Sequence, residues 1–205
     1  MSIERVTVST AGVAPRARSW LAGAAMAAVA LHTGHGHAQM GPGLASEETV
    51  RAIMQSTTVH ARGLSGPRGL LFTSGGDLLV VEQGGGTVAR ISPDGKIKRV
   101  GGFRQPHDVA IDAKGNLYVA DAGNNRIAMV SPDGKVSSWV EGLKNPVNLA
   151  FNAAGELVVC EYGANRVVAY AAPDKRRVLL TGFKAHGLAL AADGALYIND
   201  VSNKR

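Results

Sequence analysis

Short hydrophobic runs separated by polar, glycine-containing turns recur along the chain from residue 67 onward, without a helical period. In each repeat an apolar segment precedes a turn with glycine, and a strongly β-prone run follows, such as LYVAD at 117–121. A third apolar run leads into a Pro-Asp pair, and a fourth run closes the repeat. Four short strands joined by tight turns are typical of an antiparallel sheet of about forty residues.

The repeats are evenly spaced, and each begins just before its first apolar segment. The opening residues, 39, 40 and 39 positions apart, are Pro67, Pro106, Pro146 and Ala185. The predicted units are residues 67–104, 105–143 and 144–183, with a partial unit at 184–205. Each sheet carries apolar residues on both faces, and stacking the sheets around an axis covers those faces. The sequence therefore predicts an all-β fold, a β-propeller with three complete four-stranded blades and part of a fourth.

One repeat carries a family resemblance from end to end. QPHDVAIDAKGNLYVADAGNNRIAMVSPDGK, at 105–135, resembles the NHL repeat, named for its Asn-His-Leu signature, and the resemblance extends over 67–205. The units are also similar to the propellers of gluconolactonase-type hydrolases. Because such propellers usually close with six blades, the resemblance implies the front part of a six-bladed ring and of a longer reading frame. Residues 56–64 then resemble the fourth strand of a blade, the closing strand of the ring.

The first forty residues have a different composition from the repeats. Arg16 and Arg18 precede an uncharged run at 19–31, and small residues follow near Ala38. This order is typical of a secretory signal peptide, and the apolar run is too short to span a bilayer. We expect a signal peptide at 1–38, an N-terminal segment at 39–55, and a periplasmic or secreted product without stable membrane insertion after cleavage. A metal-binding tract is the alternative interpretation of the three histidines at 32, 35 and 37.

Charge and cysteine content exclude some classes of function. The net charge is +6, and removal of residues 1–38 takes away three basic residues and one acidic residue, leaving +4. These charges are scattered and aromatic residues are few, so nucleic-acid binding is not expected. Cys160 is the only cysteine, which excludes an internal disulfide and predicts a small buried side chain rather than a reactive thiol.

Acidic residues recur in register at the end of the second strand of every unit. The column is Glu82, Asp121, Glu161 and Asp200. A ring of carboxylates for metal or acid–base chemistry is one interpretation. Because Arg126 and Arg166 follow five residues after their acids, a turn-stabilising carboxylate with a charge-assisted hydrogen bond is the interpretation that explains the set.

A second column, at the entry of the first strand, is not uniform: Arg68, His107, Val147 and His186. In a propeller the first strands line the central tunnel, so we expect these side chains to converge near one mouth, as a site on a symmetric scaffold would. QPHDVAID and KAHGLALAADG also resemble the segments that present zinc-binding histidines in the peptidylglycine-amidating lyase propeller. That resemblance implies metal-ligand roles for His107 and His186, and Arg68 as a catalytic electrophile or anion clamp. Solvated, hydrogen-bonded histidines are the alternative.

Asp108 and Asn148 occupy the next column. Their side chains could bind a polar ligand in the same funnel, or they could stabilise the start of the first strand. The same column contains Gly69 and Gly187, so we do not expect its four residues to share a role.

Two functions follow as hypotheses. The first is an exported binding module that presents its mouth to a small molecule or another protein. The second is a metal-dependent hydrolase or lyase, with zinc or a similar metal held by the two histidines. A structural partner in an envelope complex is a third.

Overall fold

The computed structural model describes residues 3–6, 57–191 and 193–202, and the chain divides into two compact units. The unit of residues 2–62 contains an antiparallel pair, β1 (Ile3–Val6) and β2 (Thr57–Ala61). β1 lies within the predicted signal peptide, and the rest of that segment lies outside the described residues, so cleavage stays a prediction. β2 coincides with the predicted closing strand at 56–64; here it pairs with β1, and its place in a blade stays a prediction.

The unit that begins at Gly63 is built from antiparallel sheets whose strands follow one another in chain order. Within its described residues there are three four-stranded sheets and one two-stranded sheet, as predicted. We number them blades 1 to 4. Blade 1 comprises β3 (Pro67–Phe72), β4 (Leu78–Glu82), β5 (Thr87–Ile91) and β6 (Ile97–Gly101). Blade 2 comprises β7 (Pro106–Ile111), β8 (Leu117–Asp121), β9 (Arg126–Val130) and β10 (Val136–Val140). Blade 3 comprises β11 (Pro146–Phe151), β12 (Leu157–Glu161), β13 (Arg166–Ala172) and β14 (Lys175–Thr181), and blade 4 comprises β15 (Ala185–Leu190) and β16 (Leu196–Asp200).

The second strands are the most buried part of the unit. Every residue of β4, β8 and β12 is buried. Each of these strands has a hydrogen-bonded neighbour on both edges, and side chains from adjacent sheets fill the space on both faces. A strand buried on both faces needs a continuous apolar run instead of an alternating one. This explains runs such as LLVVE and LVVCE, which end on a buried acid.

The turns after the second strands depend on residues that accept a left-handed backbone. Asn125 and Asn165 have φ angles of 53° and 50°, and each follows a short 3-10 turn, η3 (Ala122–Asn124) or η4 (Tyr162–Ala164). Gly86 takes the corresponding place in blade 1 with φ of 62°. Asparagine and glycine tolerate this region best, which explains why these residue types occupy the turns between the second and third strands.

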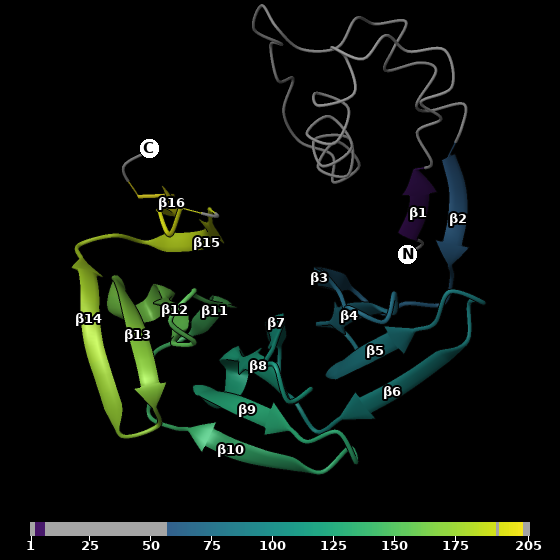
Figure 1. Cartoon of the computed structure of the whole chain (residues 1–205), viewed down its shortest axis with the longest axis horizontal. Coiled ribbons are helices and arrows are strands. Elements are labelled where there is room, and N and C mark those ends of the chain that lie inside the picture. Colours follow the sequence, from purple (N-terminus) through teal and green to yellow (C-terminus); the bar gives the residue numbers. More distant parts are fainter. Residues whose placement is uncertain (1–2, 7–56, 192, 203–205) are drawn as a thin grey trace, which may run out of the picture. The chain divides into compact units, whose positions relative to one another are not determined.

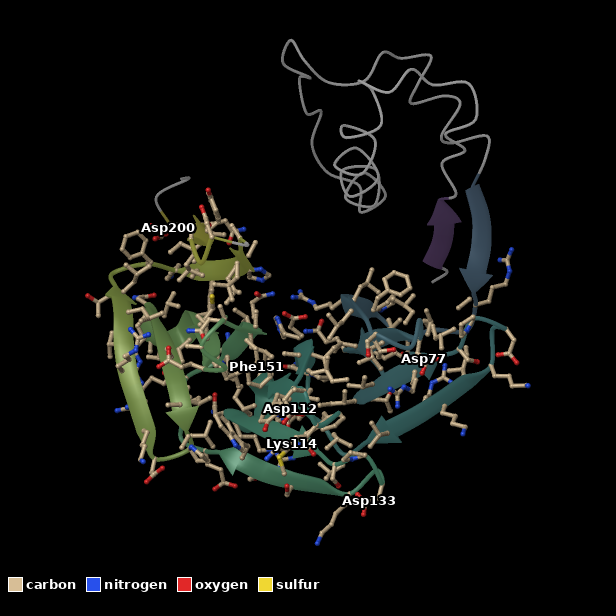
Figure 2. All side chains as sticks on the ribbon, in the orientation of Figure 1. Asp77, Asp112, Lys114, Asp133, Phe151 and Asp200 are labelled. Carbon is tan, nitrogen blue, oxygen red and sulfur yellow. The ribbon has the colours of Figure 1, made fainter. Side chains whose placement is uncertain are left out.

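The blades fan around their first strands, as Figure 1 shows. β7 contacts β3 on one side and β11 on the other, and β11 in turn contacts β15, whereas β6, β10 and β14 lie at the periphery. Apolar clusters fill the spaces between neighbouring blades (Figure 2). This arrangement confirms the expected propeller-type fold; the number of blades in a complete ring stays a prediction. In the described residues no helix has the length and apolar character needed to cross a membrane.

Candidate functional site

The variable column at the strand entries converges at one end of the first strands. Arg68 is the second residue of β3, and His107 and His186 are the second residues of β7 and β15. Because these strands adjoin in the order β3, β7, β11, β15, residues about forty positions apart come within contact distance. Val147, the equivalent residue of β11, is buried in the cluster between blades 3 and 4 and does not take part. Three of the four predicted positions therefore form one side-chain group.

Arg68 and His107 are joined by a direct hydrogen bond. Nη1 of Arg68 lies 3.0 Å from Nδ1 of His107, and Nε of Arg68 donates to Oε1 of Gln83 over 3.1 Å. A guanidinium has only donors, so Nδ1 of His107 is the acceptor. The neutral imidazole then carries its proton on Nε2. His107 is thus fixed as a hydrogen-bond donor on its other side.

The second histidine brings an aromatic wall to the group. The rings of His107 and His186 have centroids 6.0 Å apart at an interplanar angle of 61°. Tyr162 lies edge-on to His186, also at 6.0 Å, and Nζ of Lys184 is 5.8 Å from the centre of the Tyr162 ring. The group therefore combines a guanidinium, two imidazoles, a phenol ring and an ammonium group.

Sequence reasoning did not find Gln83, Tyr162 and Lys184. Gln83 and Tyr162 occupy the same repeat column, directly after the buried acids, and Ala122 stands between them in blade 2. A search for every column in which the repeats disagree would have found this one. We name the group of Arg68, His107, His186, Tyr162 and Lys184 the mouth cluster.

The electrostatics of the mouth cluster keep its imidazoles neutral near pH 7. Burial, followed by the positive charge of Arg68 and by that of His186 when it is protonated, lowers the pKa of His107 to about 4. Burial and Arg68 also lower the pKa of His186. Each imidazole resists protonation because partial burial disfavours the cation and a guanidinium is close by. The lasting positive charges of the cluster are those of Arg68 and Lys184.

Among the described residues, the mouth cluster offers two histidines and no third side chain of the types that usually bind zinc. Catalytic zinc usually has three protein ligands, and the described residues contain no group of three or more His, Cys, Asp or Glu side chains placed to hold a metal. A metal-bound histidine normally donates its second N–H to an acceptor, whereas Nδ1 of His107 accepts from Arg68. The structure thus brings His107 and His186 together with a guanidinium against one of them. Their role as metal ligands stays a prediction.

The next column holds neighbouring blades together. Nδ2 of Asn148 donates to Oδ2 of Asp108 over 2.6 Å, and the backbone N–H of Leu188 donates to Oδ1 of Asn148 over 3.1 Å. On the other side, a Cβ at Gly69 would lie 2.5 Å from Oδ1 of Asp108. The glycine at 69, which argued against a shared role, is what makes room for the carboxylate. Asp108 and Asn148 therefore link neighbouring blades at the start of their first strands, which agrees with the interpretation that they hold the strand entry.

The recurring acids are structural, as predicted from the arginines that follow them. Nε of Arg126 lies 2.7 Å from Oδ2 of Asp121, and Nε of Arg166 lies 2.9 Å from Oε1 of Glu161. In blades 1 to 3 the buried carboxylate also accepts a backbone N–H from the segment that precedes the first strand of its blade. The donors are the N–H groups of Ser65 to Glu82, Arg104 to Asp121 and Lys144 to Glu161. Buried charges fully satisfied by hydrogen bonds stabilise the connection between blades and leave no free acid for catalysis.

In blade 1 the buried carboxylate is also paired with an arginine, but this arginine comes from a different strand than in blades 2 and 3. Its column equivalent of Arg126 is Thr87, which donates to Oε2 of Glu82 over 2.8 Å. Arg99 on the adjacent β6 supplies the missing guanidinium, 2.7 Å from the same oxygen. In blade 2 the equivalent of Arg99 is Ser138, which accepts from Nη1 of Arg126 over 2.9 Å. Arginine and hydroxyl have changed strands while the carboxylate has kept a guanidinium partner; the hydroxyl of Ser138 contacts Arg126 and not Asp121.

Cys160 is buried in the cluster between blades 3 and 4, as expected. Burial, with a smaller effect from the Asp108 carboxylate, raises the pKa of its thiol to about 12. Reactivity requires the thiolate, so Cys160 is a packing residue.

Comparison with known proteins identifies both the repeat and the fold. Residues 103–128 match the NHL repeat, and no curated protein sequence matches the chain. The chain is similar to the selenomethionine-substituted virginiamycin B lyase of Staphylococcus aureus, with 19% identity and a TM-score of 0.59, covering 66% of this chain and 49% of the lyase. A catalytically inactive variant of that lyase with quinupristin has 18% identity and a TM-score of 0.61. The match covers 68% of this chain and 50% of the lyase. A structural-genomics target provisionally assigned as a gluconolactonase has 19% sequence identity and a TM-score of 0.59. The match covers 70% of this chain and 60% of that target.

Sheets fanned around adjoining first strands, with an asymmetric group at the strand entries, define a β-propeller with a candidate site at its mouth. Residues 103–128 match the NHL repeat, and the fold is similar to that of the gluconolactonase-like and virginiamycin B lyase β-propellers. The chain spans about half the length of the lyase structures that it resembles.

Proposed function

We propose that this chain is a binding module that holds the carboxylate group of a small molecule at the mouth cluster. The observation that carries the proposal is the Arg68–His107 contact. A guanidinium that donates to a neutral imidazole keeps its positive charge, and the imidazole gains a fixed Nε2–H donor. Two donors from neighbouring blades, one of them charged, suit an anionic oxygen pair.

The hydrogen-bond partners of Arg68 differ from those of the arginines that stabilise the fold. Arg99, Arg126 and Arg166 each pair with a buried carboxylate. Among the described residues Arg68 forms no ion pair with an acid and uses only Gln83 and His107 as acceptors. Hydrogen bonds to a charged group contribute about 1.5–3 kcal/mol, so an incoming carboxylate competes well with these neutral acceptors.

The other side of the mouth cluster favours a flat apolar group next to the carboxylate. Tyr162 and His186 meet edge to face, and Lys184 lies near the Tyr162 ring. Aromatic side chains offer large apolar faces with polar edges, which suit a planar ligand. A small aromatic carboxylate therefore represents the proposed ligand class better than a simple aliphatic acid.

Catalysis is the competing hypothesis, as a metal-dependent hydrolase or lyase using His107 and His186. No observation in the described residues favours it over binding, because the donor geometry suits an anion. The location outside the cytoplasm is likewise a proposal that rests on the composition of residues 1–38.

The test is a titration of the protein with benzoate and with acetate, followed by calorimetry and by the imidazole NMR signals of His107 and His186. We expect benzoate to bind more tightly than acetate and to shift both imidazoles. Arg68→Met should weaken benzoate binding about tenfold or more. Arg90→Met is the matched control, because Arg90 is also exposed and pairs with Asp77 on a different surface of blade 1.

Equal benzoate affinity in the Arg68→Met and Arg90→Met variants would contradict the proposal. A parallel titration with zinc chloride separates the alternatives. Stoichiometric zinc that is lost in the His107→Ala/His186→Ala variant would favour the metal enzyme over the carboxylate-binding module.

A further inference from the structure

Gln83 holds the side chain of Arg68 from the turn that follows β4. Oε1 of Gln83 accepts from Nε of Arg68 over 3.1 Å, and Nη1 of Arg68 lies 3.0 Å from Nδ1 of His107. The guanidinium is therefore held at two points, one on its own blade and one on the next. An arginine side chain has many rotamers when it is free, and two such contacts restrict it to few.

The backbone of Gln83 is itself held against the segment that precedes β3. The N–H of Gln83 donates to the carbonyl of Gly66 over 2.9 Å, and the N–H of Gly84 donates to the carbonyl of Ser65 over 3.1 Å. A Cβ at Gly84 would lie 2.9 Å from Oγ of Ser65, so a glycine lets the turn approach this segment closely. The acceptor for Arg68 thus stands on a backbone that hydrogen bonds fix in place.

The two contacts leave most of the donors of Arg68 available. A guanidinium has five N–H donors, and Gln83 and His107 accept from one each, so three remain among the described contacts. Both acceptors are neutral near pH 7, because burial, and after it the charge of Arg68, holds the pKa of His107 at about 4. The orientation of Arg68 is therefore set while its positive charge is kept.

The arginines that stabilise the fold show the opposite arrangement. Arg126 lies 2.7 Å from the carboxylate of Asp121, and Arg166 lies 2.9 Å from that of Glu161. Those carboxylates orient the guanidinium groups and also neutralise them. Glutamate has nearly the shape of glutamine, so at residue 83 it would accept from Nε and cancel the charge. The choice between amide and carboxylate at Gln83 thus decides whether the guanidinium charge is available to a ligand.

The repeat equivalents of Gln83 support the strand-entry column in the same way. Tyr162, directly after the buried acid of blade 3, meets the ring of His186 edge-on. Ala122, the equivalent in blade 2, is buried and has only a methyl group to offer. In blades 1 and 3 the residue after the buried acid therefore contacts a residue of the mouth cluster.

We propose that Gln83 is the positioning residue of the mouth cluster: its amide oxygen orients Arg68 for the carboxylate of the ligand and, being neutral, leaves the guanidinium charge to that carboxylate. This role of Gln83 rests on the proposed binding of a carboxylate at the mouth cluster. It makes the residue at 83 a determinant of selectivity for anionic over neutral ligands.

The first test needs no ligand. In isotope-labelled protein at mildly acidic pH, the NMR signal of the Arg68 Nε–H group is assigned by its loss in Arg68→Met, and its hydrogen exchange is measured. Gln83→Leu removes the acceptor and should speed this exchange at least tenfold. Gln83→Glu keeps an acceptor oxygen and should preserve the protection. Equal exchange in wild type and in Gln83→Leu would overturn the proposal.

The second test is calorimetric titration with benzoate and with its neutral counterpart, benzamide. Gln83→Glu should weaken benzoate binding at least tenfold and leave benzamide binding nearly unchanged, because the new carboxylate neutralises Arg68. Gln83→Leu should weaken benzoate binding about threefold, because binding must then order a free guanidinium. In the Arg68→Met background, Gln83→Glu should have little further effect, since it acts through Arg68.

Gln105→Glu is the matched control. Gln105 is exposed and lies directly before β7, so this variant adds the same charge at the entry of a first strand. Gln105 has no contact with Arg68 among the described interactions. The control should bind benzoate within about twofold of wild type, because an exposed charge is screened by solvent and salt.

The two tests distinguish a failure of this role from a failure of the proposed function. If the wild-type chain binds no benzoate, the proposed function fails, and the exchange of the Arg68 Nε–H group alone decides whether Gln83 positions that side chain. If wild type and Gln83→Glu bind benzoate equally, the role of Gln83 is overturned and carboxylate binding stands. An undiminished effect of Gln83→Glu in the Arg68→Met background also overturns it, because residue 83 would then act on another group.

Discussion

Arg68 of blade 1 donates from Nη1 to Nδ1 of His107 in blade 2 across 3.0 Å, although 39 residues separate them in the chain. This contact fixes the tautomer of His107 and leaves the charge of Arg68 without a carboxylate partner among the described residues. A site for a cation would need hydrogen-bond acceptors or negative charges in place of these donors. The anion-binding role proposed for this repeat column therefore rests on this pair.

The first prediction concerns the pKa of His107. The value of about 4 arises from burial first and from Arg68 next, so Arg68→Met should raise the pKa of His107 while leaving it below 6.5. A pKa lowered by folding contributes stability that is present above pH 6.5 and is lost as the pH falls through about 4. Imidazole NMR titration measures the shift, with Arg90→Met as the control. An unchanged pKa in Arg68→Met would show that the guanidinium does not act on this ring.

The second prediction concerns Asp108, whose pKa burial raises to about 6 from 3.8. A raised carboxyl pKa contributes stability that is present below pH 3.8 and is lost as the pH rises through about 6. Asp108→Asn keeps an oxygen acceptor for Nδ2 of Asn148 and removes the buried charge. We expect this variant to be more stable than wild type at pH 7 and no more stable at pH 3.5, as measured by urea unfolding. Asp133→Asn, in the exposed turn between β9 and β10 (Figure 2), is the control.

The third prediction concerns the arginine and the hydroxyl residue beside the buried acid, which occupy opposite strands in blades 1 and 2. Arg99→Ser removes a guanidinium from Glu82, which is almost fully buried, and should destabilise the fold by about 3 kcal/mol. The double variant Thr87→Arg/Arg99→Ser copies the arrangement of Arg126 and Ser138 in blade 2 and should recover most of that loss. Chemical denaturation measures both values.

Arg90→Ser serves as the control for this pair of variants. Its ion pair with Asp77 is more exposed, so its loss should cost no more than about 1 kcal/mol. If the double variant were as unstable as Arg99→Ser alone, the two arrangements would not be equivalent.

The fourth prediction concerns Cys160. Its pKa of about 12 and its burial predict that a thiol reagent such as Ellman's reagent reacts only when the protein opens. Asn199 occupies the same repeat column in blade 4 and is exposed, so Asn199→Cys should react at once. Rapid reaction of the native protein would refute the burial of Cys160.

Much of the fold was predictable because its signals are local. The β-prone run LYVAD and the Asn124-Asn125 turn express β-strand propensity and backbone φ preferences, which depend on neighbours within a few residues. The acid column was also predictable in part, since Arg126 and Arg166 lie five residues after their acids. Its blade 1 version was not, because Arg99 reaches Glu82 from β6, which is separated from β4 by one strand of the sheet.

The candidate site was predictable only as a set of positions. The repeat register placed Arg68, His107 and His186 in one column and implied that they converge. It did not show that Arg68 would donate to His107, or that Tyr162 and Lys184 would join the cluster.

The sequence by itself determined the four-stranded repeat, its turns and the column in which chemistry collects, because these follow from periodicity and from residues with restricted or permissive backbones. The tertiary structure decided which partners meet: Arg68 with His107, Asn148 with Asp108, and Tyr118 with Phe151. Those contacts join residues about thirty to forty positions apart. They depend on the angle and distance at which neighbouring sheets pack, which no local pattern of residues sets.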